Sequence, residues 1–193
     1  MNYLNPKTMA HSTTQIELGA KAHHFALLDT VSDKLVSLDD VASQKATVIM
    51  FICNHCPYVR HILPVLVQVA GEYQQKGVNF VAISSNDVQL QPQDGPEEMK
   101  MMADEMQFPF PYLYDQTQMV ARHYMAECTP EFFVYDGNKR LAYHGQFDSS
   151  RPNNNVPVTG EDLRQALDLL LANKPAQAQQ QPSVGCSIKW KMQ

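Results

Sequence analysis

The chain has 193 residues, of which 44% are hydrophobic and 18% are charged, a composition that suits one globular domain with a complete core. Its net charge of −5 provides no basic surface, so we expect neither nucleic acid nor an anionic membrane as a partner. The sequence has no basic start followed by an apolar run and no stretch long enough to cross a bilayer, which predicts a cytoplasmic protein.

The first segment, residues 1–22, is polar and irregular, and we expect a flexible N-terminal arm there. Residues 25–28 and 34–36 are predicted to form two short strands around a turn. Ser37 and Asp40 have the spacing of a capping box, which predicts a short helical turn after the second strand.

The middle of the chain predicts a strand–helix–strand unit. Residues 47–52 are continuously apolar and β-branched, as in a strand buried on both faces, and residues 78–84 repeat this pattern. Between them, a helix is expected to begin at Pro57, where no backbone donor is needed, and to end at Gly77. A helix between two such strands predicts a right-handed βαβ unit with parallel strands.

The rest of the chain predicts a polar loop over residues 85–95, a Met-rich helix from Pro96 and a short helix over residues 118–124. Residues 131–135 and 140–144 read as a hairpin whose turn contains Gly137, a residue able to adopt positive φ. A last helix is expected to be capped by Thr159 together with Asp162. The predicted organisation is therefore an arm (1–22), a folded domain (23–172), and a linker with a Cys- and Trp-containing tail (173–193).

Two of the four cysteines, Cys53 and Cys56, are spaced as CxxC at the predicted strand–helix junction. The positive end of a helix dipole stabilises a thiolate, and the thiolate is the nucleophile in thiol–disulfide exchange. We expect an exposed Cys53 that attacks, with a pKa below that of a free thiol, and a more buried Cys56 that resolves. His55 adds positive charge beside the pair, and the sequence between Asp40 and Glu72 contains no acidic residue.

Two other interpretations of these cysteines remain open. Both could pack as small apolar residues of a buried unit. Alternatively, a set of sulfur and nitrogen ligands could bind zinc or copper, although no second CxxC is present. That set comprises Cys53, His55, Cys56 and His61.

Five segments give the chain a resemblance to the thioredoxin-like superfamily, and within it to the alkyl hydroperoxide reductase/thiol-specific antioxidant (peroxiredoxin-like) family. They are residues 51–58, 82–87, 108–113, 128–133 and 185–190. The resemblance implies an α/β thioredoxin-like fold, with a central mixed β-sheet flanked by helices. It also implies that Thr129 and Pro130 form a cis-proline element opposite the dithiol, where they present an extended substrate backbone.

The chain departs from both relatives that the resemblance suggests. Ile52 stands where thioredoxin has Trp, and Asn54 and His55 replace Gly-Pro between the cysteines. In the Thr-x-x-Cys motif of peroxiredoxins, Cys56 would take the peroxidatic position and Cys53 the threonine position. Whether peroxide is a substrate is therefore open at the level of sequence.

We accordingly expect a thiol–disulfide oxidoreductase without cofactor or bound metal; the alternatives are a thiol-dependent peroxidase and a Cys/His metal-binding or redox-sensing module. Its partners would be a disulfide-containing protein or a small thiol or disulfide, with peroxide as the alternative, and a cellular dithiol reductant. Cys128 precedes the proline element, and Cys186 lies in the tail, so both are candidate auxiliary thiols. One hypothesis is that Ile188 and Trp190 dock the tail and so hold Cys186 near the dithiol; the alternative is a free cysteine on a mobile tail.

Overall fold

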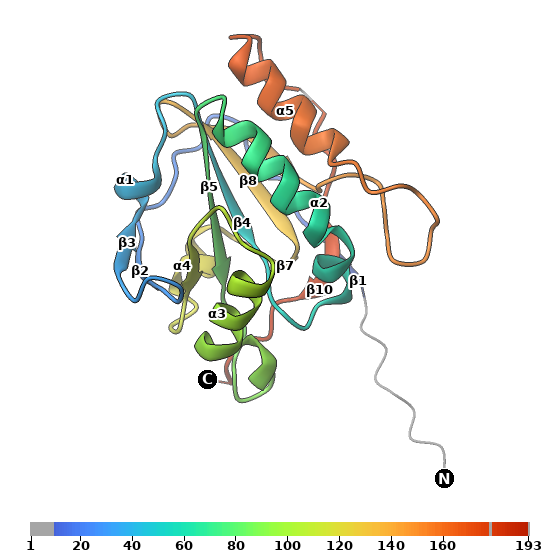
Figure 1. The fold of residues 1–193 in the computed structure, drawn as a ribbon. Helices are drawn as coiled ribbons and strands as arrows, with labels where there is room; N and C mark the ends of the chain where they lie inside the picture. The colour runs from blue at the N-terminus through green and yellow to red at the C-terminus, as the bar shows by residue number, and fades with distance from the viewer. Residues whose placement is uncertain (1–9, 178, 193) are drawn as a thin grey trace.

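The computed structural model describes residues 10–177 and 179–192. Seven strands form a mixed sheet in the order β3-β2-β6-β5-β4-β8-β9, and three further strands form a small sheet in the order β1-β10-β7 (Figure 1). The strands of the large sheet are β2 (Ala26–Asp29), β3 (Leu35–Ser37), β4 (Ala46–Phe51), β5 (Val78–Ser84), β6 (Tyr112–Tyr114), β8 (Glu131–Asp136) and β9 (Leu141–Gly145). The predicted α/β thioredoxin-like architecture, a central mixed sheet flanked by helices, is confirmed.

Helices cover both faces of the large sheet. They are α1 (Leu38–Val41), α2 (Pro57–Gln74), the 3₁₀ turn η1 (Pro92–Asp94), α3 (Pro96–Glu105), α4 (Met119–His123) and α5 (Glu161–Leu171). One apolar cluster joins α2, α3 and α5 to one face of the sheet, and a second joins α1 and α4 to the other. Alternate residues of β4 enter the two clusters, Val48 the first and Ile49 the second, which explains its uninterrupted apolar sequence.

The predicted strand–helix–strand unit is present, with β4 and β5 paired in parallel along their length. On its other side β4 pairs antiparallel with β8, so Phe51 lies opposite Glu131. This pairing matters for the site, because the residues that follow β4 and those that precede β8 meet at the same end of the sheet. The capping box of Ser37 and Asp40 is also confirmed.

Two local expectations were wrong. In the β8–β9 turn, Lys139 takes the positive φ of 59°, whereas a Cβ on Gly137 would lie 2.1 Å from the carbonyl oxygen of Gln44. Close backbone approach is therefore what requires glycine at position 137. At the start of α5 the N-cap is Gly160, which has a φ of 69°, and no side chain caps the helix, so Thr159 does not act as predicted.

The arm and the tail pack against each other. Residues 1–9 of the predicted arm lie outside the described residues, but β1 (Ala10–Ser12) pairs with β10 (Val184–Ser187), and β10 pairs with β7 (Cys128–Thr129). Figure 1 shows β10 and β1 beside the N-terminal end of α2. The expectation of a loose arm is thus wrong for its second half, because residues 10–13 are hydrogen-bonded to the tail, and Gly19 and Ala22 donate to the β8–β9 hairpin.

None of the helices in the described part of the chain combines the length and apolar character needed to cross a bilayer.

Candidate active site

The two CxxC cysteines lie where the buried strand β4 gives way to α2. Cys56 is the N-cap residue of α2 and Pro57 occupies the first turn, as the sequence predicts. The first turn contains no acidic residue, so no side-chain charge on the helix offsets the positive end of its dipole. The thiols of Cys53 and Cys56 interact with each other, which brings the predicted dithiol together.

The proline element faces this pair, as the resemblance implied. The peptide bond between Thr129 and Pro130 is cis. The hydroxyl of Thr129 lies 3.3 Å from the Cys53 sulfur, and its carbonyl oxygen lies 3.2 Å from the Cys56 sulfur. One residue of the loop therefore contacts both thiols.

The expectation of an exposed Cys53 was wrong. Both Cys53 and Cys56 are fully buried in this conformation, as are Cys128 and Cys186, and all four are free thiols. The Thr129 hydroxyl contacts the Cys53 sulfur, and the Cys186 sulfur contacts the Cys56 sulfur. The residues of the site are all in place, but both thiols are shielded from solvent. A substrate disulfide therefore reaches them only when some of the surrounding residues move.

The distribution of charge over the dithiol is the reverse of the prediction. Burial raises the pKa of Cys53 well above its ordinary value, and the nearby thiol of Cys56 and carboxylate of Asp94 raise it further. Burial also acts to raise the pKa of Cys56, but hydrogen bonds from Cys186, Cys53, Thr129 and the Val59 backbone outweigh it and lower the pKa far below that of a free thiol. These pKa directions favour ionisation of Cys56 before Cys53.

His55 is held by a carboxylate that the sequence analysis did not identify. Asp94 Oδ2 lies 2.6 Å from His55 Nδ1, while the Cys53 sulfur lies 3.6 Å from the same nitrogen. Asp94 Oδ1 accepts hydrogen bonds from the backbone N–H groups of Asn54 and His55, at 2.8 and 3.0 Å. Burial acts to raise the pKa of Asp94, yet hydrogen bonds from His55 and Asn86 hold it below its ordinary value.

Asp94 makes the electrostatic field at Cys53 more negative than the neighbouring sequence predicts. No acidic residue is present between Asp40 and Glu72, but η1 brings Asp94 beside Cys53 from a later part of the chain. The only sequence signal near it is the helix start that Gly95 and Pro96 mark, and that signal says nothing about a side chain turned toward the dithiol.

The ligand set of the alternative metal-binding interpretation is assembled only in part. Possible ligand atoms of Cys53, His55 and Asp94 lie within 4.8 Å of one another, whereas Cys56 and His61 do not join this group among the described residues. The two oxygens of Asp94 already accept four hydrogen bonds, including one from Asn86 at 2.8 Å. A metal ion bound here would have to displace some of them.

A second buried carboxylate, that of Glu131, holds the backbone that precedes the cis-proline. Glu131, fully buried, accepts hydrogen bonds from the backbone N–H groups of Glu127 and Cys128, at 2.8 and 3.1 Å. Its other oxygen lies 2.6 Å from Nε2 of the buried His144. Burial strongly raises the pKa of the Cys128 thiol, so this predicted auxiliary thiol is protonated, and its sulfur is directed at the Pro130 carbonyl oxygen, 3.8 Å away.

The tail docks as expected. Ile188 is buried in the second apolar cluster, and Trp190 packs against it under the guanidinium of Arg122, 4.5 Å from the ring centre. The Cys186 sulfur lies 2.9 Å from that of Cys56. The predicted proximity of Cys186 to the dithiol is confirmed.

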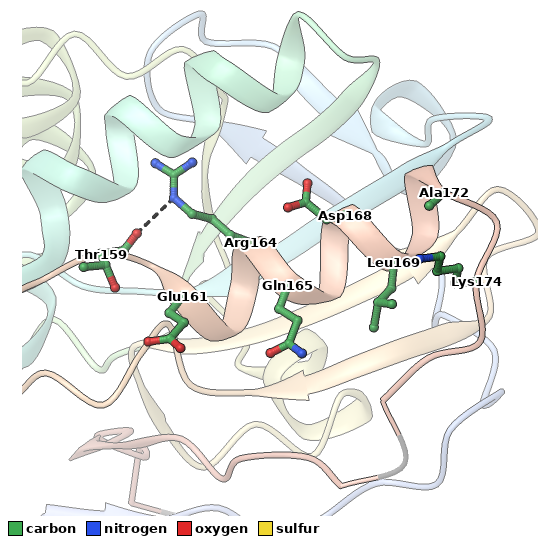
Figure 2. A pocket seen from close by; sticks show the side chains of 8 residues that line it. All are labelled: Thr159, Glu161, Arg164, Gln165, Asp168, Leu169, Ala172 and Lys174. Atoms are coloured by element: carbon green, nitrogen blue, oxygen red, sulfur yellow. Dashed lines mark hydrogen bonds between the residues drawn. The ribbon is translucent and has the colours of Figure 1, made fainter.

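Two hollows lie on the surface near these elements. One of about 900 Å³ follows α5, and its lining contains no cysteine and no member of the site (Figure 2). A second, of about 530 Å³, lies between α2 and α3 and includes Asn54, Arg60 and three methionines in its lining. The second hollow thus reaches Asn54, the residue after Cys53, and a much smaller one is lined by Pro130 and Val184 beside the cis-proline.

Comparison with known families identifies the chain. A model of the AhpC/TSA family matches residues 18–144, which include the CxxC, Asp94 and the cis-proline. The chain belongs to the AhpC/TSA family. The recognition made from the five sequence segments is thereby confirmed, although the tail that carries Cys186 lies beyond the matched region of this AhpC/TSA protein. A search of curated proteins finds no match.

Solved structures similar to this AhpC/TSA protein agree with its fold. An uncharacterized conserved protein from Geobacillus kaustophilus is 52% identical, with a TM-score of 0.94 over 96% of this chain and 98% of that one. A hypothetical protein from Sinorhizobium meliloti 1021 is 42% identical, with a TM-score of 0.91 over 94% and 99%. A thioredoxin-family thiol:disulfide interchange protein from Chlorobium tepidum TLS, 18% identical, superposes with a TM-score of 0.61 over 82% and 99% and shows the fold alone.

Proposed function

We propose that this protein is a thiol–disulfide oxidoreductase whose working group is the Cys53–Cys56 dithiol. The observation that carries the proposal is the convergence of two interacting thiols on the N-terminus of α2, opposite the cis-proline. The lowered pKa of Cys56 supports Cys56, rather than Cys53, as the sulfur that attacks in this proposal, because the thiolate is the nucleophile. Cys53 then acts as the resolving thiol.

The proposed exchange has two steps. The Cys56 thiolate attacks one sulfur of a substrate disulfide, a Cys56–substrate disulfide forms, and the other substrate sulfur leaves as a thiolate that takes up a proton. Cys53 then loses its proton and attacks the Cys56 sulfur, which forms the Cys53–Cys56 disulfide and releases the second substrate thiol. The substrate gains two electrons, and a cellular dithiol restores the protein by the reverse exchange.

Residues around the dithiol have separate roles in this proposal. The N-terminus of α2 and the Val59 backbone stabilise the Cys56 thiolate. His55 is a positioning residue: Asp94 holds its imidazole ring, and the ring contacts the Cys53 sulfur through Nδ1. Thr129 and Pro130 offer the loop beside which an extended substrate lies. A cytoplasmic location with a disulfide-containing protein or small disulfide as substrate completes the proposal.

A thiol peroxidase is the second candidate, and the lowered pKa of Cys56 favours it as well. Here the Cys56 thiolate attacks a peroxide oxygen and forms a sulfenic acid, while the other oxygen takes up a proton and leaves as an alcohol or water. Cys53 condenses with the sulfenic acid, which forms the same disulfide and releases water. Membership of the AhpC/TSA family supports this alternative, and so does the resemblance to the Thr-x-x-Cys motif, in which Cys56 would take the peroxidatic position.

Turnover assays separate these candidates. Reduction of insulin or glutathione disulfide, and consumption of hydrogen peroxide with a thiol donor, should be measured on the wild-type protein and on Cys53→Ser, Cys56→Ser and Cys128→Ser. We expect disulfide turnover in the wild type and in Cys128→Ser, and its loss in the other two variants.

Full disulfide turnover by Cys56→Ser would contradict the proposal, and turnover with peroxide but not with disulfides would favour the peroxidase. Metal content of the purified protein tests the remaining alternative of a metal-binding module. One equivalent of bound zinc or copper, lost in Cys53→Ser, would support that module instead.

A further inference from the structure

The tail occupies the edge of the cis-proline loop. Strand β10 pairs antiparallel with β7, and Cys186 lies opposite Thr129, the residue before Pro130. The Cys186 side chain reaches the dithiol from there, with its sulfur 2.9 Å from Cys56. The protein's own chain therefore holds the strand position in which we propose that an extended substrate lies.

The fit between tail and loop depends on a glycine. A Cβ on Gly185 would lie 2.0 Å from the carbonyl oxygen of Thr129 and 3.2 Å from the nitrogen of Pro130. A residue with any side chain could not approach the loop so closely. Glycine at this position thus allows the backbone to pass against the cis-proline and brings the next residue, Cys186, over Cys56.

Contacts on both sides of β10 fix its position. Before the strand, the Thr13 N–H donates to the Ser183 carbonyl oxygen and the Ser183 N–H donates to the Thr13 hydroxyl, each at 3.1 Å. After it, the backbone N–H of Lys189 donates to Asn86 Oδ1 at 2.8 Å, and Asn86 in turn donates to Asp94 at 2.8 Å. The tail is therefore joined to the carboxylate that holds His55, so that tail and dithiol share one hydrogen-bond network.

We propose that Cys186 is a third redox thiol, which forms a disulfide with Cys56 in place of Cys53 and so closes the tail over the oxidised site. The inference deepens the proposed function and rests on it, because the Cys53–Cys56 disulfide is its starting point. The two sulfurs are already closer than a van der Waals contact allows, and only a small movement separates them from bonding distance.

The step is an internal thiol–disulfide exchange. Cys186 loses its proton and attacks the Cys56 sulfur of the Cys53–Cys56 disulfide. The Cys56–Cys186 bond forms, the Cys53–Cys56 bond breaks, and Cys53 leaves as a thiolate that takes up the proton. No electrons are gained or lost overall, so the step requires no further oxidant.

The exchange would give the protein two oxidised forms. With the Cys53–Cys56 disulfide, the tail is free to leave and the loop edge is open to a partner. With the Cys56–Cys186 disulfide, β10 is tied covalently to α2, and the edge of β7 stays occupied until a reductant opens the bond. Cys128 takes no part, because its sulfur is directed at Pro130 rather than at Cys56.

Tryptic mapping distinguishes these disulfides. Cys53 and Cys56 fall on one peptide, residues 46–60, whereas Cys186 falls on residues 165–189, because Lys174 precedes a proline and is not cleaved. The full-length protein should be oxidised with glutathione disulfide, quenched in acid, alkylated and digested without reductant. In the Cys53→Ser variant, oxidised in the same way, Cys56 is the only cysteine left on peptide 46–60. Any link from that peptide to peptide 165–189 must then involve Cys56.

We expect a linked pair of peptides 46–60 and 165–189 in the wild type and in Cys53→Ser, unchanged in Cys128→Ser and absent in Cys186→Ser. A wild type with only the disulfide internal to peptide 46–60 would overturn the role of Cys186 and leave the proposed function standing. If Cys53 and Cys56 both remain alkylated as free thiols, the proposed function fails together with the inference.

Discussion

Replacement of Gly185 by alanine tests how the tail covers the dithiol. The added Cβ would lie 2.0 Å from the Thr129 carbonyl oxygen, so the two backbones must separate by about 1.4 Å to reach ordinary contact. The loop is held by the hydrogen bonds of Glu131 to the Glu127 and Cys128 backbones, so we expect the tail to be the part that moves. Overpacking of this kind costs about 1–3 kcal/mol.

That free energy acts against the closed position of the tail. A cost of about 1–3 kcal/mol corresponds to a shift of roughly 5- to 150-fold in an equilibrium constant. We therefore expect the Cys56 thiol of reduced Gly185→Ala to react with iodoacetamide about 5- to 150-fold faster than in the wild type, as followed by mass spectrometry of peptide 46–60. The cause is the more frequent exposure of Cys56 when the tail leaves.

Gly71→Ala is the matched control, because Gly71 lies inside α2 and a Cβ there meets no atom within 4 Å. Alanine in a helix interior is more favourable than glycine by about 0.5–1 kcal/mol, so this variant should be slightly more stable and should keep the wild-type alkylation rate. An unchanged rate at Cys56 in Gly185→Ala would refute the reasoning, since the tail would then not limit access.

Three further predictions concern the charges of the site. Because the folded-state pKa of Cys56 is lowered, its thiolate should persist at pH values below the ordinary thiol pKa of about 8.5. Absorbance at 240 nm should therefore show one thiolate near neutral pH, which Cys56→Ser lacks and Cys53→Ser retains. A single titration near the ordinary thiol pKa would contradict this prediction. Asp94→Asn places an amide donor against the Asn86 amide and leaves buried donors without an acceptor. The free energy of unfolding in urea should therefore fall by about 1–3 kcal/mol. A change within experimental error would argue against the hydrogen-bond network around Asp94. Cys128→Ser should keep the wild-type disulfide map and turnover, and the wild-type Cys128 should resist iodoacetamide because burial raises its pKa; rapid labelling would oppose this assignment.

Much of the fold could be predicted because its main signals are local. The apolar runs that became β4 and β5, the Pro57 that begins α2, and the hairpin of β8 and β9 all follow from residue order alone. The Cys53–Cys56 pair and the cis-proline opposite it were also predicted, the first from the strand–helix junction and the second from the family resemblance.

The chemistry of the dithiol could not be predicted because it depends on long-range contacts. Asp94 reaches Cys53 from a 3₁₀ turn in a segment that reads only as a polar loop, and its charge raises the pKa that sequence reasoning expected to be lowered. Glu131 and His144 meet only when β8 and β9 pair. The sequence indicated that Trp190 and its neighbours would dock, but not that the tail would form a strand against the proline loop.

A glutathione redox titration with thiol counting tests the central claim most directly. The protein is equilibrated over a range of glutathione to glutathione disulfide ratios, quenched in acid, alkylated and weighed by mass spectrometry. We expect two of the four thiols to disappear together at one midpoint in the wild type, and none to disappear in Cys56→Ser. Four free thiols at every ratio in the wild type, or an unaltered two-thiol transition in Cys56→Ser, would contradict it.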